Sequence, residues 1–189
     1  MSKRDEILKA AKNLFWRQGY DATSPKQIQS ESSAGQGSFY HHFPSKKALA
    51  IEVIRQTVTE RLEAAQNAFS GTNDFFTRFD RFLDIASNPL YGCKVGRWLW
   101  DASIVEDIDL RGPLAFYFTS VGELLMKELT QAETRGEIWL QVPKHQLALM
   151  IMAVVQGGFV LSRANQSPDK SADALKGLRQ TLMFALSPS

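Results

Sequence analysis

The chain has 189 residues, 44% of them hydrophobic, which is enough for a small module and one larger helical domain and argues against disorder. Its only cysteine is Cys93, so no intrachain disulfide can form, as expected in a reducing compartment. The net charge is +2, but it is unevenly distributed. Residues 1–50 hold eight Lys and Arg against four Asp and Glu, whereas residues 51–189 carry a net charge of −2. This distribution suggests a polyanionic partner for the N-terminal part.

No targeting segment is expected from the sequence. The first residues are charged and no apolar stretch of a signal peptide follows them. The longest uninterrupted apolar run, Leu147–Val155, is too short to cross a bilayer, and Gln156 and two glycines follow it. We therefore expect a cytoplasmic protein with no membrane partner.

The N-terminal part contains start and stop signals for two helices. Ser2 and Asp5 have the spacing of a capping box, and Gly19 is predicted to end the helix that they begin. Ser24 and Gln27 have the same spacing at the start of a second, shorter helix. The apolar residues that share one face of the first helix are Ile7, Leu8, Ala11, Leu14 and Phe15.

A third short helix is expected in the aromatic segment 35–43, which stops at Pro44. Its Phe39 and Phe43 are predicted core residues. Ser45 then caps a long fourth helix. A short helix, a turn and another short helix form the helix-turn-helix arrangement of DNA-binding proteins.

The rest of the chain also has helical periodicity. An apolar, mostly aromatic stripe from Phe75 to Ala86 predicts one helix that Asn88-Pro89 ends, and Pro113 and Pro143 are each predicted to begin another. The last helix is expected from about Ser171 to Leu186. The sequence contains no convincing strand, repeat or low-complexity tract, so we predict an all-α fold of about nine helices.

The stretch from Gly19 to Leu49 resembles the DNA-binding domain of TetR-family transcriptional regulators. The matching residues are Gly19-Tyr20, Ala22-Thr23-Ser24, Ile28, the run from Gly37 to Lys46, and Leu49. The resemblance implies an N-terminal three-helix helix-turn-helix domain, residues 1–48. It implies a C-terminal helical domain for ligand binding and dimerisation, residues 49–189.

The turn departs from the family pattern at three positions. Ser33, Ala34 and Gly35 stand where the family usually has a glycine, a β-branched residue and a Ser or Thr cap. Ser33 is therefore predicted to adopt a left-handed backbone conformation. Gly35 remains an acceptable N-cap.

The predicted recognition helix begins with Gln36, Gly37 and Ser38, which are small or polar. Such residues allow a helix to approach base edges in the major groove closely. Gln36 can form two hydrogen bonds with an adenine.

Further DNA contacts are expected around this helix. Lys46, next to the capping Ser45, can hold a phosphate by its charge at a helix start. Tyr40 and His42 resemble family positions that contact phosphate. The complete set of predicted DNA-binding residues is Ser24, Lys26, Gln36, Gly37, Ser38, Tyr40, His41, His42 and Lys46.

The resemblance also implies a partner and an effector. It implies a homodimer through the last two helices that binds a double-stranded operator, and repression as the usual outcome. Gly157 and Gly158 in mid-helix suggest close backbone approach, either between subunits or within one chain. The aromatic content of the body suggests a small apolar or aromatic effector. The predicted ligand-binding residues are Phe79, Phe82, Cys93, Trp98 and Phe118.

The sequence also allows two other functions. A constitutive helical DNA-binding protein and an oxidant-sensing regulator acting through Cys93 both remain open, although a small buried hydrophobe is the simpler interpretation of Cys93. Enzymatic activity is not expected, because the only histidines are His41, His42 and His145 and no carboxylate cluster or phosphate-binding loop accompanies them. No cofactor is expected, and no metal, since adjacent histidines on a helix point apart.

Overall fold

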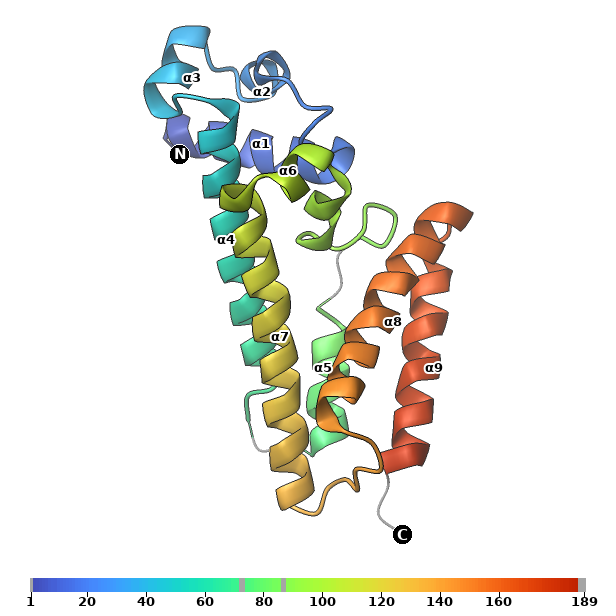
Figure 1. The fold of residues 1–189 in the computed structure, drawn as a ribbon. Coiled ribbons are helices and arrows are strands. Elements are labelled where there is room, and N and C mark those ends of the chain that lie inside the picture. Colours follow the sequence, from blue (N-terminus) through green and yellow to red (C-terminus); the bar gives the residue numbers. More distant parts are fainter. Residues whose placement is uncertain (1, 72–73, 86–87, 187–189) are drawn as a thin grey trace. The chain divides into compact units, whose positions relative to one another are not determined.

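The computed structural model describes residues 2–71, 74–85 and 88–186 (Figure 1). Within these ranges the chain forms nine α-helices, one 3-10 helix and no strand, which confirms the predicted all-α class. The helices are α1 (Lys3–Gln18), α2 (Pro25–Glu31), α3 (Gln36–His42), α4 (Lys46–Ala68), α5 (Phe75–Leu83), η1 (Gly96–Trp100), α6 (Ala102–Glu106), α7 (Ile108–Thr134), α8 (Lys144–Asn165) and α9 (Asp169–Leu186).

The chain divides into two compact units. The first contains Met1–Glu60 and Lys94–Tyr117, and the second contains Arg61–Cys93 and Phe118–Ser189. Helices α4 and α7 contribute residues to both units. The functional boundary between residues 48 and 49 stays a prediction, because compactness does not reveal which residues bind DNA or an effector.

Capping interactions fix the start of the first two helices as predicted. Ser2 Oγ accepts a hydrogen bond from the Asp5 amide at 3.2 Å, and the Ser2 amide donates to Asp5 Oδ2 at 3.0 Å. Ser24 and Gln27 repeat this reciprocal pair at the start of α2. Gly19 ends α1 with a φ of +98°, which glycine adopts without a steric penalty.

The first unit has an aromatic core that includes a segment distant in sequence. Phe15 of α1 and Phe39 of α3 are fully buried, as predicted for Phe39. Trp98 of η1 packs against Phe15 with ring centroids 5.1 Å apart and against Tyr20 at 6.4 Å. Each such side chain contributes about 1.5–3 kcal/mol of burial free energy. Residues 94–117 are therefore part of the folded helix-turn-helix unit.

The predicted start of a helix at Pro113 is wrong, because Pro113 lies inside α7. The helix begins earlier because Asp107 caps it: its Oδ1 accepts from the Asp109 amide at 3.0 Å, and its carbonyl accepts from the Arg111 amide at 2.8 Å. Pro113 sits in the second turn, where it removes one helical hydrogen bond without ending the helix. The predicted end of the Phe75 helix at Asn88-Pro89 is also wrong, because α5 ends at Leu83 with Asp84 as its C-cap; Ala86, the last residue of the predicted stripe, lies outside the described residues.

In the second unit, α8 and α9 pack side by side (Figure 1). Ser162 Oγ, fully buried, accepts from the Ser171 amide at 2.8 Å. A Cβ at Gly158 would lie 3.3 Å from Ser171 Cα, whereas a Cβ at Gly157 would meet no atom within 4 Å. The close approach at Gly158 is therefore explained by two helices of one chain, whereas close approach of a second subunit to these glycines stays a prediction.

A buried ionic cluster joins α5 to α7 and to the segment after it. Arg78, almost completely buried, forms an ion pair with Glu137 at 3.1 Å, and its Nε lies 3.8 Å from Glu128. Removing one partner of a buried ion pair leaves an uncompensated charge, which typically costs about 3–5 kcal/mol. This cluster therefore fixes how these segments pack within the unit.

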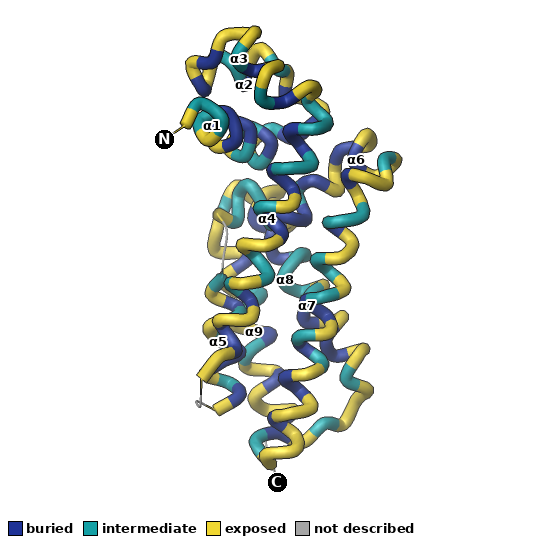
Figure 2. The backbone as a smooth tube through the Cα atoms, turned by 90° about the vertical axis from the view of Figure 1, so that its left-hand side faces the viewer, coloured by how far each residue is buried: buried dark blue, intermediate teal, exposed yellow. Residues whose placement is uncertain are grey.

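Helix α8 is long and apolar enough to span a membrane by length and composition, which corrects the expectation from the run Leu147–Val155. The helix has 22 residues, because Gln156 and the two glycines continue it rather than end it. An 18-residue stretch of the helix has a mean hydropathy of 1.7. Only 33% of that 18-residue stretch is buried. Exposed positions alternate with buried ones along α8 and α9 (Figure 2). One such helix is weak support for a membrane span, because helices of soluble proteins can share this composition.

Candidate nucleic-acid interface

The turn between α2 and α3 has the predicted left-handed residue. Ser33 has a φ of +50°. Its amide donates to the Ser30 carbonyl at 3.3 Å, and the Ala34 amide donates to the Gln29 carbonyl at 2.9 Å. Ala34 is buried, so the turn is anchored although the family's usual glycine is absent.

Helix α3 buries one side chain and exposes its N-terminal end. Phe39 has no exposed surface, whereas Tyr40 is 44% exposed and Gln36 and Gly37 face solvent. A Cβ at Gly37 would meet nothing within 4 Å, so packing within the unit does not require a glycine there. The small residue leaves room for another molecule to approach the start of α3.

All nine predicted DNA-binding residues lie in the first unit. Six of them are exposed: Ser24, Lys26, Gln36, Gly37, Tyr40 and His41. The half-buried ones are Ser38, His42 and Lys46. The rings of His41 and His42 are 5.1 Å apart, and no group of three His, Cys, Asp or Glu residues could hold a metal ion within the described ranges.

Lys46 has a structural role that sequence reasoning missed. Its ammonium group donates to the carbonyls of Tyr20 and Thr23, both at 3.1 Å, and lies 4.1 Å from the centroid of the Tyr20 ring. It therefore holds the loop between α1 and α2, and one N–H remains for a phosphate. No local pattern indicates this role, because the two carbonyls lie more than twenty residues earlier in the chain.

The Ser24 hydroxyl is also engaged within the fold. It donates to Gln27 Oε1 at 3.0 Å and accepts from the Gln27 amide at 3.2 Å. The neighbouring Lys26 is exposed on α2. Of these two predicted contacts, Lys26 is thus the better placed to reach a phosphate.

Ion pairs reduce the positive charge predicted for the N-terminal part. Arg4 pairs with Glu52 at 3.2 Å. Lys47 forms ion pairs with Asp107 at 2.7 Å and with Asp109 at 2.8 Å. The hydrogen bond from Lys47 holds the pKa of Asp107 below its usual range, and the two carboxylates raise the pKa of Lys47.

The net charge of the folded unit reflects these acidic partners. Residues 51–60 and 94–117 each add one net negative charge to the +4 of residues 1–50, so the first unit carries +2. A contact with DNA therefore depends on where exposed cations such as Lys26 lie rather than on the total charge.

The predicted effector residues are divided between the two units. Phe79 and Phe82 of α5 belong to a stack with Phe75 and Phe69 whose neighbouring centroids are 5.1–6.4 Å apart. Cys93 and Phe118 are half-buried in the second unit. Trp98 is 4% exposed in the first unit, where it is a core residue.

Both cations that were expected to activate Cys93 have other partners. The Lys94 ammonium lies 5.1 Å from the centroid of the Trp16 ring. Arg97 forms an ion pair with Asp101 at 3.4 Å. The oxidant-sensing alternative stays a prediction that these contacts do not favour.

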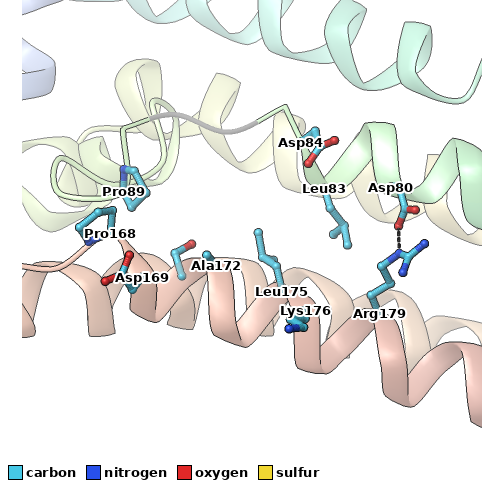
Figure 3. A pocket seen from close by; sticks show the side chains of 11 residues that line it. Asp80, Leu83, Asp84, Pro89, Pro168, Asp169, Ala172, Leu175, Lys176 and Arg179 are labelled. Atoms are coloured by element: carbon cyan, nitrogen blue, oxygen red, sulfur yellow. Dashed lines mark hydrogen bonds and ion pairs between the residues drawn. The ribbon is translucent and has the colours of Figure 1, made fainter.

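A groove of about 590 Å³ lies between α5 and α9 in the second unit (Figure 3). Leu83 and Leu175 point toward one another across it, and the ion pair between Asp80 and Arg179, at 2.5 Å, lies toward one end. Pro89 and Pro168 lie toward the other end (Figure 3). None of the predicted effector residues lines this groove. Its lining residues come from segments that are distant in sequence and meet where α5 packs against α9.

The fold and the exposed start of α3 define a helix-turn-helix DNA-binding protein. Residues 7–53 match the family model of bacterial regulatory proteins of the tetR family. The uncharacterized HTH-type transcriptional regulator YxaF of Bacillus subtilis is 29% identical over 172 residues, which cover 86% of each chain. The HTH-type transcriptional repressor KstR2 of Mycolicibacterium smegmatis is 33% identical over 89 residues, 47% of this chain and 37% of that protein.

A solved TetR-family regulator from Agrobacterium tumefaciens has the same fold, with a TM-score of 0.86 at 21% identity over 96% of this chain and 97% of that one. Residues 7–53 therefore match the N-terminal DNA-binding domain of the tetR family, and most of the chain is similar to HTH-type transcriptional regulators. The relatives that match are named as transcriptional regulators or repressors, in line with the expectation that the chain is not an enzyme.

The role of Lys46 gives a first prediction. Lys46→Met keeps the aliphatic stem but leaves two carbonyls without their charged donor, so we expect the free energy of unfolding to fall by about 1–3 kcal/mol. Urea unfolding measures this change. Lys26→Met, the matched control on an exposed lysine, is expected to unfold like the unaltered protein. Equal stability of the two variants would refute the structural role of Lys46.

Proposed function

We propose that the chain is a repressor that binds an inverted-repeat operator as a homodimer and dissociates when a small apolar or aromatic molecule binds. The observation that carries the DNA-binding part is the start of α3, where Gln36 and Gly37 face solvent above the buried Phe39. The name repressor carried by KstR2 of Mycolicibacterium smegmatis supports the direction of regulation.

In this proposal, α3 enters the major groove with Gln36 at a base edge and Lys26 of α2 at a phosphate. Ser38, Tyr40, His41 and His42 complete the contacts along α3. Because the dimer is two-fold symmetric, the two half-sites lie about one helical turn apart or a multiple of it.

Selection from a random duplex library provides the operator for the test. Gln36→Ala is expected to weaken binding by about 1–3 kcal/mol through one base pair and to relax the preference there. Lys26→Met is expected to weaken all duplexes alike and to lower the salt slope by about one phosphate contact. Lys170→Met, on an exposed lysine of α9, is the control and should change neither quantity. An unchanged base preference for Gln36→Ala would reject its role as a reading residue.

The dimer is proposed from the outer faces of α8 and α9. Leu149, Gly157 and Leu161 follow helical spacing along α8, and both leucines are exposed. Phe184 of α9 is 90% exposed. A contiguous apolar face of this kind is covered most simply by the same face of a second copy in an isologous interface.

Phe184→Glu and Gly157→Leu test the interface. Neither position packs within its own chain, so we expect both variants to fold, to sediment as monomers and to lose operator affinity. Phe116→Glu, on an aromatic residue of α7 that is 60% exposed, is the control for charge on an apolar surface. Variants that remain dimeric would place the interface elsewhere.

The effector is proposed to bind in the second unit. The groove between α5 and α9 has a volume within the range of about 300–1,000 Å³ typical of ligand sites. Its apolar residues, Leu83 and Leu175, suit an apolar ligand, and the half-buried Phe82 precedes Leu83 on the same helix. A ligand that binds better to the form with low DNA affinity shifts the population toward that form.

Release of a fluorescent operator duplex, measured by polarisation across a library of small apolar and aromatic compounds, tests this site. Leu175→Trp fills the groove and should raise the releasing concentration about tenfold, equivalent to about 1.4 kcal/mol. Gln131→Trp, on an exposed residue of α7, is the control. An unaltered response of Leu175→Trp would move the site toward Phe79 and Phe82. If no compound releases DNA, the protein binds constitutively and the sensing proposal fails.

A further inference from the structure

The loop between α1 and α2 is held by a buried carboxylate from a distant segment of the first unit. Asp101, which lies between η1 and α6, is 9% exposed. Its Oδ2 accepts from the Tyr20 amide at 3.0 Å, and its Oδ1 accepts from the Asp21 amide at 3.3 Å. In return, Asp21 Oδ2 accepts from the Ser103 amide at 3.4 Å. Two consecutive loop amides therefore depend on one side chain that follows them by eighty residues.

Gly19 is needed at this contact for two reasons. Its φ of +98° is unfavourable for residues with a Cβ, and a Cβ there would lie 2.5 Å from Arg97 Nη2 and 2.8 Å from Asp101 Oδ1. Arg97 donates to Asp101 Oδ2 at 3.4 Å, so the guanidinium and the carboxylate close over the glycine together.

The other side of the same loop is bound as well. Lys46 holds the carbonyls of Tyr20 and Thr23, and Thr23 Oγ1 donates to the Gly19 carbonyl at 2.6 Å. The Tyr20 residue is thus fixed through its amide by Asp101 and through its carbonyl by Lys46. Since Ser24 caps α2 directly after this loop, the loop conformation sets where α2 begins.

Packing stability alone does not account for the arrangement around Asp101. Arg97 Nε is buried and has no hydrogen-bond partner among the described residues. A buried donor left in this way lowers the stability of the fold. The position of Arg97 over Gly19 is therefore set by its ion pair with Asp101 rather than by full hydrogen bonding of the guanidinium.

We infer that Asp101 is a positioning residue for DNA binding, which holds the loop 19–23 so that α2 and α3 meet DNA in the required arrangement. The inference rests on the proposed DNA-binding function and deepens it, because it gives η1 and α6 of the first unit a role in DNA binding. It assigns Asp101 no contact with DNA.

The substitution Asp101→Asn isolates this role. A carboxylate accepts on both oxygens, whereas an amide presents one oxygen and one NH₂ group. In Asp101→Asn, either the Tyr20 amide or the Asp21 amide then faces a donor, while the size of the side chain is kept. Glu106→Gln removes the same charge from an exposed position of α6 and is the matched control.

Two measurements on the full chain test the inference. Hydrogen exchange of the Tyr20 and Asp21 amides should accelerate in Asp101→Asn while amides of α8 and α9 keep their protection, which a general loss of stability would not produce. Affinity for the selected operator duplex should fall about tenfold or more, the range expected for charge-assisted hydrogen bonds. Glu106→Gln should change either quantity less than twofold.

A second pair of variants tests the same contact without substituting an ionisable residue. Gly19→Ala displaces Arg97 and Asp101, whereas Gly71→Ala imposes the same backbone strain at φ +98° with no neighbour closer than 4.0 Å. We expect reduced operator affinity in Gly19→Ala only.

The outcomes separate the two proposals. If the unaltered protein selects an operator and Asp101→Asn binds it equally well, the positioning role is overturned and the proposed function stands. If exchange accelerates throughout the protein, Asp101 acts on stability alone and the inference is again overturned. If the unaltered protein selects no duplex, the proposed function fails and the DNA-positioning role fails with it.

Discussion

The DNA-binding unit depends on how the backbone between α1 and α2 is held. A loop at this position has amides and carbonyls that no helix can satisfy, and buried backbone groups must find partners elsewhere. Here the Asp101 carboxylate supplies the acceptor and the Lys46 ammonium supplies the donor, with Tyr20 between them. The Tyr20 ring packs on Phe15 and Trp98, so polar and apolar contacts fix the same residue. These contacts fix the loop that leads into α2.

Interactions between residues close in sequence were predictable, and those between distant residues were not. The capping pairs of Ser2 with Asp5 and of Ser24 with Gln27 were predicted from their spacing alone, because a cap bonds within one helical turn. The left-handed Ser33 was predicted from the resemblance to TetR-family regulators, which usually have a glycine at this position of the turn. The helix start predicted at Pro113 was wrong because a proline is tolerated at several positions near the start of a helix. The carboxylate of Asp107, which caps α7, indicates the start of this helix better.

The features of the candidate sites also differ in whether they depend on local sequence or on contacts between distant segments. The exposed start of α3 and the buried Phe39 follow from the polar and apolar pattern of residues 35–43, so sequence reasoning reached them. The carbonyl partners of Lys46 and the groove beside Leu83 depend on segments that meet only in the folded unit. Trp98 shows the converse: an aromatic residue predicted for an effector site is a core residue of the DNA-binding unit. Aromatic residues indicate that a segment is buried, but they do not indicate which other segment it packs against.

The two adjacent glycines of α8 show how one sequence feature can carry two constraints. Gly158 admits Ser171 of the same chain at a distance that a side chain would obstruct, which explains the glycine without a partner. Gly157 has open space instead and follows the spacing of Leu149 and Leu161 on the outer face. A glycine in mid-helix lowers helix stability by about 1 kcal/mol relative to alanine, so a glycine without a neighbour in its own chain calls for another reason. The proposed close approach of a second copy would supply that reason and would also cover the apolar residues that give α8 its high hydropathy. A lipid bilayer would cover the same residues but would give Gly157 no backbone to meet, so the second copy accounts for more of what the helix contains.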